Sequence, residues 1–198
     1  MAASAVTSVP HWWNLPNQIT ASRLVLTAVV FVCFELQWYL AATILFVIAA
    51  ATDWLDGYLA RRYGQVTRLG RILDPFVDKL IVCGVFIYFG TLPKSGVPGW
   101  IPVLVMAREL LVTALRGEVE GRGGDFSARW SGKWKMAAQC VAATIALISL
   151  TYWPGAEPVP DWMWWLRAAA LAIAVVLTVH SGYVYVLDAR RILTRPTA

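Results

Sequence analysis

A short stretch of the sequence, residues 53–78, carries four aspartates: Asp53, Asp56, Asp74 and Asp78. Residues three or four apart share a helix face, so these aspartates form two pairs on two helical segments. Carboxylates that converge repel one another unless cations lie between them. Clustered carboxylate oxygens suit hard divalent ions such as Mg²⁺ or Mn²⁺. The stretch therefore predicts a site for divalent cations.

Small residues and an arginine accompany the aspartates. Gly57, Ala60 and Gly70 carry almost no side chain, which leaves room for a diphosphate or a flat ring near the backbone. Such residues serve equally well for close helix packing in a membrane, and both alternatives stay open. Arg61 is placed for a phosphate contact. Paired divalent ions can bridge a diphosphate and stabilise both the attacking and the leaving oxygen. These residues indicate metal-dependent chemistry on a phosphate-bearing substrate.

The composition predicts an all-α integral membrane protein. Of 198 residues 59% are hydrophobic and 15% charged, with 11 tryptophans and a mean hydropathy of +0.59. Apolar runs near the length needed to cross a bilayer fall at roughly 22–40, 40–60, 74–92, 100–117, 134–153 and 162–187. We therefore expect six spans. The second span runs into Asp53 and the third begins at Asp74, so an up-and-down helix pair brings both acid pairs to one end.

The net charge of +5 follows the predicted topology. Most arginines and lysines fall in the loops after the second, fourth and sixth runs. By the positive-inside rule both termini and the acidic stretch face the cytoplasm. Because the basic residues follow topology, we expect no nucleic-acid binding.

The rest of the chain suggests one domain, 14–190, between a mobile tail (1–13) and a basic C-terminal tail (191–198). Residues 1–13 carry no positive charge, which argues against a cleavable signal peptide. The three cysteines are an odd number without metal spacing and predict no disulfide framework. Residues 13–23 could lie flat on the membrane before the first span begins near Ser22. Arg23 could snorkel to lipid head groups or belong to the site.

Charged residues deep in the fourth run need a separate explanation. Arg108 and Glu109 lie about 12–14 Å below the outer end of that run, a depth at which charges are rare and usually functional. A structural Arg–Glu pair that locks the bundle is the alternative. Lys133 and Lys135 are two residues apart, so a regular helix would point them to nearly opposite sides. Either one of them faces head groups, or the backbone there is not a plain helix.

The acidic stretch resembles a known family signature. Asp53-x-x-Asp56-Gly57-x-x-Ala60-Arg61, then eight residues, then Gly70-x-x-x-Asp74-x-x-x-Asp78 resembles, position for position, the motif of the CDP-alcohol phosphotransferase family. The resemblance implies six spans around a polar cavity open to the cytoplasm, a homodimer, and a place in a bacterial-type cytoplasmic (inner) membrane.

The family resemblance also implies roles for residues. Two divalent cations, Mg²⁺ or Mn²⁺, would be held by Asp53, Asp56 and Asp74, with Asp78 in or near the second site and acting as the catalytic base. The CDP-lipid pocket would be lined by Asp56, Gly57, Ala60, Arg61, Thr67 and Gly70. The acceptor oxygen would attack the β-phosphate of the CDP-lipid and expel CMP.

Further segments resemble the branch of the family that transfers a phosphatidyl group from CDP-diacylglycerol to glycerol 3-phosphate and so serves anionic phospholipid synthesis. They are residues 14–26, 107–110 with 115–116, and 132–139. An anionic acceptor needs cations, and the available ones are Arg108, Arg116, Lys133 and Lys135. Met136 departs from the threonine usual in this branch.

Three alternatives compete with the interpretation as a phosphatidyltransferase that uses glycerol 3-phosphate. A sister enzyme would use serine, inositol phosphate or phosphatidylglycerol as the acceptor, and serine would not require the basic residues. An intramembrane prenyltransferase also uses aspartates with Mg²⁺, but it needs more spans than this chain supplies. A divalent-ion transporter would place its carboxylates near mid-membrane, whereas here they lie at the inner edge beside Arg61.

Overall fold

The computed structural model describes residues 15–63, 70–121, 130–154 and 158–194; within these, the side chains of 15–20, 53–63, 70–75 and 78 lie outside the description. The described residues form six α-helices and one short 3₁₀-helix, with no strand among them. The elements are α1 (Leu15–Glu35), α2 (Tyr39–Tyr63), α3 (Gly70–Thr91), η2 (Pro93–Ser95), α4 (Trp100–Gly121), α5 (Trp130–Tyr152) and α6 (Asp161–Leu193). The prediction of an all-α protein is confirmed.

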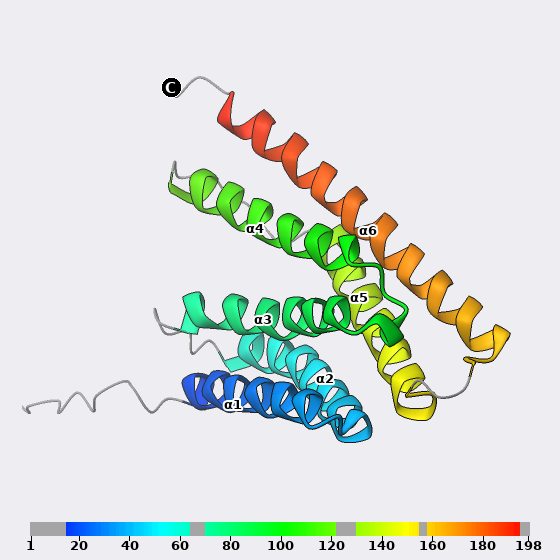
Figure 1. Cartoon of the computed structure of the whole chain (residues 1–198). Coiled ribbons are helices and arrows are strands. Elements are labelled where there is room, and N and C mark those ends of the chain that lie inside the picture. The colour runs from blue at the N-terminus through cyan, green and yellow to red at the C-terminus, as the bar shows by residue number, and fades with distance from the viewer. Residues whose placement is uncertain (1–14, 64–69, 122–129, 155–157, 195–198) are drawn as a thin grey trace, which may run out of the picture.

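The helices run alternately up and down, and α5 lies at the centre of their contacts. It packs on α2, α3 and α6, while α1 packs on α2 and α3, and α4 packs on α3 and α6. In Figure 1 the helices α2, α4 and α6 end on the left, the side on which α3 begins. The connections from α1 to α2 and from α3 to α4 lie on the right. The end of α2 and the start of α3 therefore share one end of the bundle, as predicted.

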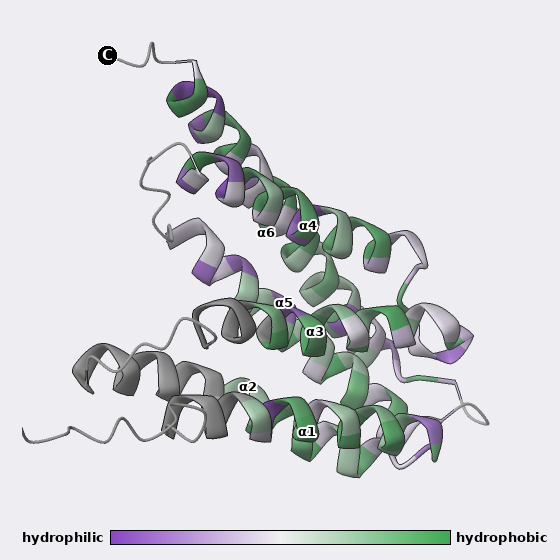
Figure 2. Ribbon diagram, turned by 90° about the vertical axis from the view of Figure 1, so that its left-hand side faces the viewer, coloured by the Kyte–Doolittle hydropathy of each residue, from purple (hydrophilic) through white to green (hydrophobic). Residues whose placement is uncertain are grey.

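The described helices are apolar both inside and outside. Figure 2 shows hydrophobic residues along the helices and hydrophilic ones near the C-terminal ends of α4 and α6. Large apolar side chains such as Val103, Leu110 and Val176 are 60% or more exposed, a pattern that suits contact with lipid rather than water. Within the described residues, α5 and α6 are long and apolar enough to cross a bilayer, and Tyr39–Thr52 and Lys79–Thr91 form shorter apolar helices. These features suggest a membrane protein, and the number of six spans stays a prediction.

An aromatic cluster holds α1, α2 and α3 together away from the acidic stretch. Phe34, Phe46, Phe86 and Phe89 are fully buried. Phe89 meets Phe34 and Phe86 edge-on, with ring centroids 6.2 and 6.0 Å apart, the arrangement that aromatic pairs prefer. On α5, in contrast, Ala142, Ala143 and Ala146 have no exposed surface. These small side chains let neighbouring helices approach α5 closely.

The helix boundaries differ from the predicted spans in two places. The first helix begins at Leu15 and continues through Ser22, so residues 15–23 and the first apolar run form one continuous helix; that residues 13–23 lie flat on the membrane surface stays a prediction. No breaker stands between Pro16, which a first helical turn tolerates, and the apolar run. The third helix begins at Gly70 and not at Asp74. The aspartate therefore lies one turn inside α3 and Pro75 follows it within the helix.

The connection between α3 and α4 is fixed by a buried arginine at the end of the bundle opposite the acidic stretch. Gly96 ends η2 with φ +64°, a left-handed conformation. Ser95 is fully buried, and its hydroxyl donates to the carbonyl oxygen of Phe89 at 2.8 Å. A Cβ at position 96 would overlap the guanidinium of Arg167. That guanidinium donates to Ser149 Oγ at 3.1 Å, so the turn, α5 and α6 meet at this point.

Replacing Gly96 by alanine should therefore destabilise the protein. The left-handed backbone and the overlap with Arg167 together should cost about 1–3 kcal/mol of unfolding free energy. Thermal unfolding in detergent measures the effect as a lower Tm. Gly99→Ala is the matched control, because a Cβ at Gly99 meets nothing within 4 Å. Equal melting temperatures for the two variants would contradict the assignment of this turn.

Candidate active site

The backbone places the acidic stretch where the sequence predicts it. Asp53 and Asp56 belong to the last turns of α2, and Asp74 and Asp78 to the first turns of α3. The side chains of these four aspartates lie outside the described residues, as do those of Gly57, Ala60, Arg61 and Gly70. Thr67 lies outside them altogether. How the carboxylates face one another therefore stays a prediction.

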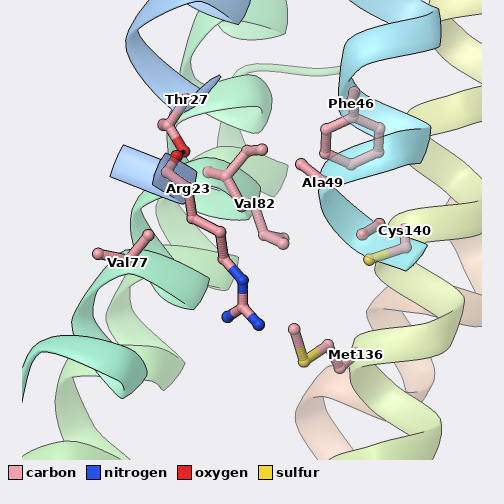
Figure 3. A pocket seen from close by; sticks show the side chains of 10 residues that line it. Arg23, Thr27, Phe46, Ala49, Val77, Val82, Met136 and Cys140 are labelled. Carbon is pink, nitrogen blue, oxygen red and sulfur yellow. Dashed lines mark hydrogen bonds between the residues drawn. The ribbon is translucent and has the colours of Figure 1, made fainter. Parts of the chain in front are cut away.

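A pocket lies next to this stretch, between α1, α2, α3 and α5 (Figure 3). Its lining residues are Arg23, Thr27, Phe46, Ala49, Ala50, Val77, Ile81, Val82, Met136 and Cys140. Ala49 precedes Asp53 by one turn of α2, and Val77 is the neighbour of Asp78. One helical turn is about 5.4 Å long, so the pocket begins about one turn from Asp53 on α2 and adjoins Asp78 on α3.

Arg23 faces this pocket and is buried between the helices. Its side chain is 9% exposed, and Figure 3 shows the guanidinium directed between the helices toward Met136. The reason is the rotation of α1, which buries Arg23 on the same face as Thr27, Val30 and Phe34. The alternative that Arg23 snorkels to head groups is therefore wrong. Met136, the departure from the usual threonine, lines the pocket on α5.

A second group of charged side chains lies between α4, α5 and α6. Arg108, Glu109 and Lys135 are each more than nine-tenths buried. Arg108 Nη1 donates to Glu109 Oε1 at 3.0 Å, and Lys135 Nζ donates to the same oxygen. Arg108 also donates from Nη2 to Ser181 Oγ at 2.6 Å. Its guanidinium carbon lies 5.3 Å from the centroid of the Tyr185 ring.

A third lysine approaches this group from α3. Lys79, the residue after Asp78, donates from Nζ to Thr113 Oγ1 on α4. Thr113 in turn donates to the backbone oxygen of Glu109 at 2.7 Å. Lys79 interacts electrostatically with Glu109, Arg116 and Arg108. Lys79 is not one of the four cations predicted to bind the acceptor; its place beside Asp78 is the signal that could have found it.

Arg116 lies two turns further along α4 than Glu109. Its side chain is half-buried, and its Nε is buried without a hydrogen bond in the part of the chain that the structure describes. Glu109, Thr113 and Arg116 are four and three residues apart, so they share one face of α4. This face connects the buried group to the end of the bundle that holds the acidic stretch.

The two lysines of α5, Lys133 and Lys135, lie on different sides of the helix. Both belong to one regular helix, so the alternative of an irregular backbone is wrong and they point to different sides. Lys135 is buried against Glu109, whereas Lys133 is exposed with its Nζ 4.8 Å from the centroid of the Trp130 ring. Of the four predicted acceptor-binding cations, the structure brings Arg108, Arg116 and Lys135 to one region and leaves Lys133 outside it.

The described side chains of this group carry more positive than negative charge. Lys79, Arg108, Arg116 and Lys135 contribute four positive charges, and Glu109 contributes one negative charge; Arg108 and Lys135 are buried, whereas Lys79 and Arg116 are half-buried. Burying an excess of like charges is unfavourable unless an anion binds among them. A phosphate offers two negative charges and several acceptor oxygens, and charge-assisted hydrogen bonds to it are strong. Chemically, the arrangement can bind a phosphate-bearing molecule beside the acidic stretch.

Comparisons of the sequence with known proteins find relatives that match most of the chain. The sequence model of the CDP-alcohol phosphatidyltransferase family matches residues 13–180. A relative from Bacillus subtilis (strain 168) is 34% identical over 189 residues, which cover 87% of this chain and 93% of the relative. One from Pectobacterium atrosepticum is 35% identical and covers 93% and 99%, and one from Escherichia coli (strain K12) is 34% identical and covers 90% and 96%. All three are named CDP-diacylglycerol–glycerol-3-phosphate 3-phosphatidyltransferase.

The matched region includes the acidic stretch, the pocket at Arg23 and the buried cations of α3, α4 and α5. Because the family model matches most of the chain, the prenyltransferase and the ion transporter considered above are excluded. The chain belongs to the CDP-alcohol phosphatidyltransferase family of enzymes.

Proposed function

We propose that this enzyme transfers the phosphatidyl group from CDP-diacylglycerol to sn-glycerol 3-phosphate, giving phosphatidylglycerophosphate and CMP. The names of relatives that match nearly the full chain support these substrates. The observation that carries the proposal in the structure is the excess of cations around Glu109 among the side chains that the structure describes. An acceptor that bears its own phosphate would need such a group.

The four aspartates are the proposed ligands of two divalent cations, Mg²⁺ or Mn²⁺. The donor set fits, because carboxylate oxygens are what these ions prefer and both helix ends that carry them belong to one end of the bundle. When bound, the ions neutralise the diphosphate and stabilise the leaving group. The CDP-lipid is then expected against Asp56, Gly57, Ala60, Arg61, Thr67 and Gly70.

Asp78 is the proposed general base. Its carboxylate accepts the proton of the acceptor hydroxyl, whose oxygen forms a bond to the phosphorus next to the diacylglycerol. The bond from that phosphorus to the CMP oxygen breaks, and CMP leaves with the electron pair. Lys79, the next residue, contacts Thr113 beside Glu109. The acceptor phosphate would therefore sit on Arg108, Arg116 and Lys135, which belong to the two helices, α4 and α5, that pack against the helix carrying Asp78.

The proposed setting is the cytoplasmic (inner) membrane of a bacterium, with six spans around a polar cavity and with both termini and the site on the cytoplasmic side. The placement of arginines and lysines and the alternating helix directions support this orientation. We further propose a homodimer, as is general in the family.

The second candidate is a sister enzyme with another acceptor. Inositol phosphate would also satisfy the buried cations, so this observation keeps it in consideration. Serine carries no phosphate, and phosphatidylglycerol carries its phosphate as a diester with one negative charge. Neither would account as well for the four cations that the described part of the chain places around Glu109.

Release of CMP tests the proposal. Purified protein in detergent with Mg²⁺ or Mn²⁺ is mixed with CDP-diacylglycerol and one acceptor: glycerol 3-phosphate, inositol phosphate, serine or phosphatidylglycerol. We expect CMP with glycerol 3-phosphate only, and loss of at least 100-fold in rate when EDTA removes the metal. Release with another acceptor alone would move the assignment to a sister enzyme. Full activity in EDTA would overturn the metal site.

A further inference from the structure

We infer that Glu109 is a positioning residue for the acceptor site: its carboxylate holds Lys135 and Arg108 in the places from which they bind the acceptor phosphate. The inference rests on the proposed function. The sequence left open an alternative in which Arg108 and Glu109 form a pair that only stabilises helix packing. The inference differs from it because both cations bonded to Glu109 belong to the proposed binding group.

The contacts put Glu109 at the centre of that group. One oxygen, Oε1, accepts hydrogen bonds from both Arg108 Nη1 and Lys135 Nζ. The backbone oxygen of the same residue accepts from Thr113, to which Lys79 donates. Glu109 therefore connects cations from α3, α4 and α5, and it is 8% exposed.

The two cations depend on Glu109 to different degrees. Arg108 has further anchors, because it donates to Ser181 Oγ at 2.6 Å and faces the Tyr185 ring. For Lys135, Glu109 is the hydrogen-bond partner that the described part of the chain provides. Lysine has a flexible stem and a single ammonium group, so its position near Arg108 is set by this one carboxylate.

Electrostatics explains why the carboxylate is required. Two buried cations that share one oxygen repel each other strongly in a medium of low dielectric constant. With the charge of Glu109 removed, the ammonium of Lys135 would turn away from Arg108 or lose its proton. In either case the acceptor phosphate loses one charge-assisted hydrogen bond. The diphosphate of the other substrate, which is expected at the acidic stretch, keeps its contacts.

Steady-state kinetics with both substrates varied tests the inference. Glu109→Gln keeps the shape of the side chain and removes its charge. We expect the KM for glycerol 3-phosphate to rise about tenfold, the size of one charge-assisted bond of roughly 1.4 kcal/mol, and the KM for CDP-diacylglycerol to change less than twofold. Glu109→Asp retains the charge and should restore part of the acceptor affinity. Glu120→Gln, an exposed position on the same helix, is the matched control.

The alternative outcomes are distinct. If both KM values rise together, or if only the Tm falls while the two KM values stay at the wild-type level, Glu109 is a scaffold residue and the inference is overturned. If Glu109→Gln fails to fold, the two KM values are measured for Glu109→Asp instead. We then expect a smaller rise in the KM for glycerol 3-phosphate, and an unchanged KM would contradict the inference. Failure of the proposed function itself would appear in the wild type, as absence of CMP release with glycerol 3-phosphate.

Discussion

Asp78→Asn should lower turnover by about 10³-fold, within the range that loss of a general base produces. The amide has nearly the shape of the carboxylate but cannot accept the proton of the acceptor hydroxyl. The CDP-lipid does not need that proton transfer to bind, so its affinity should stay within a few-fold of the wild type. CMP release measures the first effect, and equilibrium binding of CDP-diacylglycerol in detergent measures the second.

The comparison of the two measurements decides the role of Asp78. Asp161→Asn is a matched control, because this exposed aspartate lies in the first turn of α6, remote along the chain from the acidic stretch. A variant at position 78 that turns over at more than a tenth of the wild-type rate rules out the base. Loss of CDP-lipid binding together with turnover would make Asp78 chiefly a ligand of the metal that holds the diphosphate.

Lys135→Ala should raise the KM for glycerol 3-phosphate by at least 30-fold, more than any change in the KM for CDP-diacylglycerol. Truncation removes one proposed phosphate ligand and leaves the buried carboxylate of Glu109 with Arg108 as its remaining hydrogen-bond donor among the described side chains. A carboxylate that keeps fewer partners would also repel the incoming phosphate. Losses of 2–5 kcal/mol are typical when one member of a buried charge pair is removed.

The same assay applied to Lys133→Ala separates the two lysines. Lys133 is exposed and lies over the Trp130 ring, so we expect its acceptor KM to change less than threefold. Lys94→Ala, at an exposed lysine of η2, controls for the loss of one positive charge. A large effect at Lys133 and a small one at Lys135 would reverse the assignment, and would mean that the acceptor binds on the outer face of α5.

Much of this protein is determined by spacing along the chain. The aspartates at 53, 56, 74 and 78 follow helical periodicity within one stretch, so their family motif is visible before any folding is considered. Hydropathy likewise predicts six helical segments, because each apolar run must satisfy its own backbone hydrogen bonds within a membrane. These are local properties of the sequence, and the aspartate motif sufficed to identify the family; the substrates were predicted from the resemblance of further segments, 14–26, 107–110 with 115–116 and 132–139.

The rotation of each helix and the choice of its neighbours were decided only by tertiary structure. Whether Arg23 points to lipid or to Met136 depends on which face of α1 packs inward. The apolar residues of α1 are spread around the helix, so the sequence alone does not indicate that face. Lys133 and Lys135 cannot be distinguished as acceptor-binding residues from their sequence positions. The packing of α5 buries Lys135 against Glu109. Lys79 likewise lies near the cations of α4 because α3 packs against α4. Pairs such as Lys135 and Glu109, 26 residues apart, meet only when helices pack, because their interaction has no counterpart in local spacing.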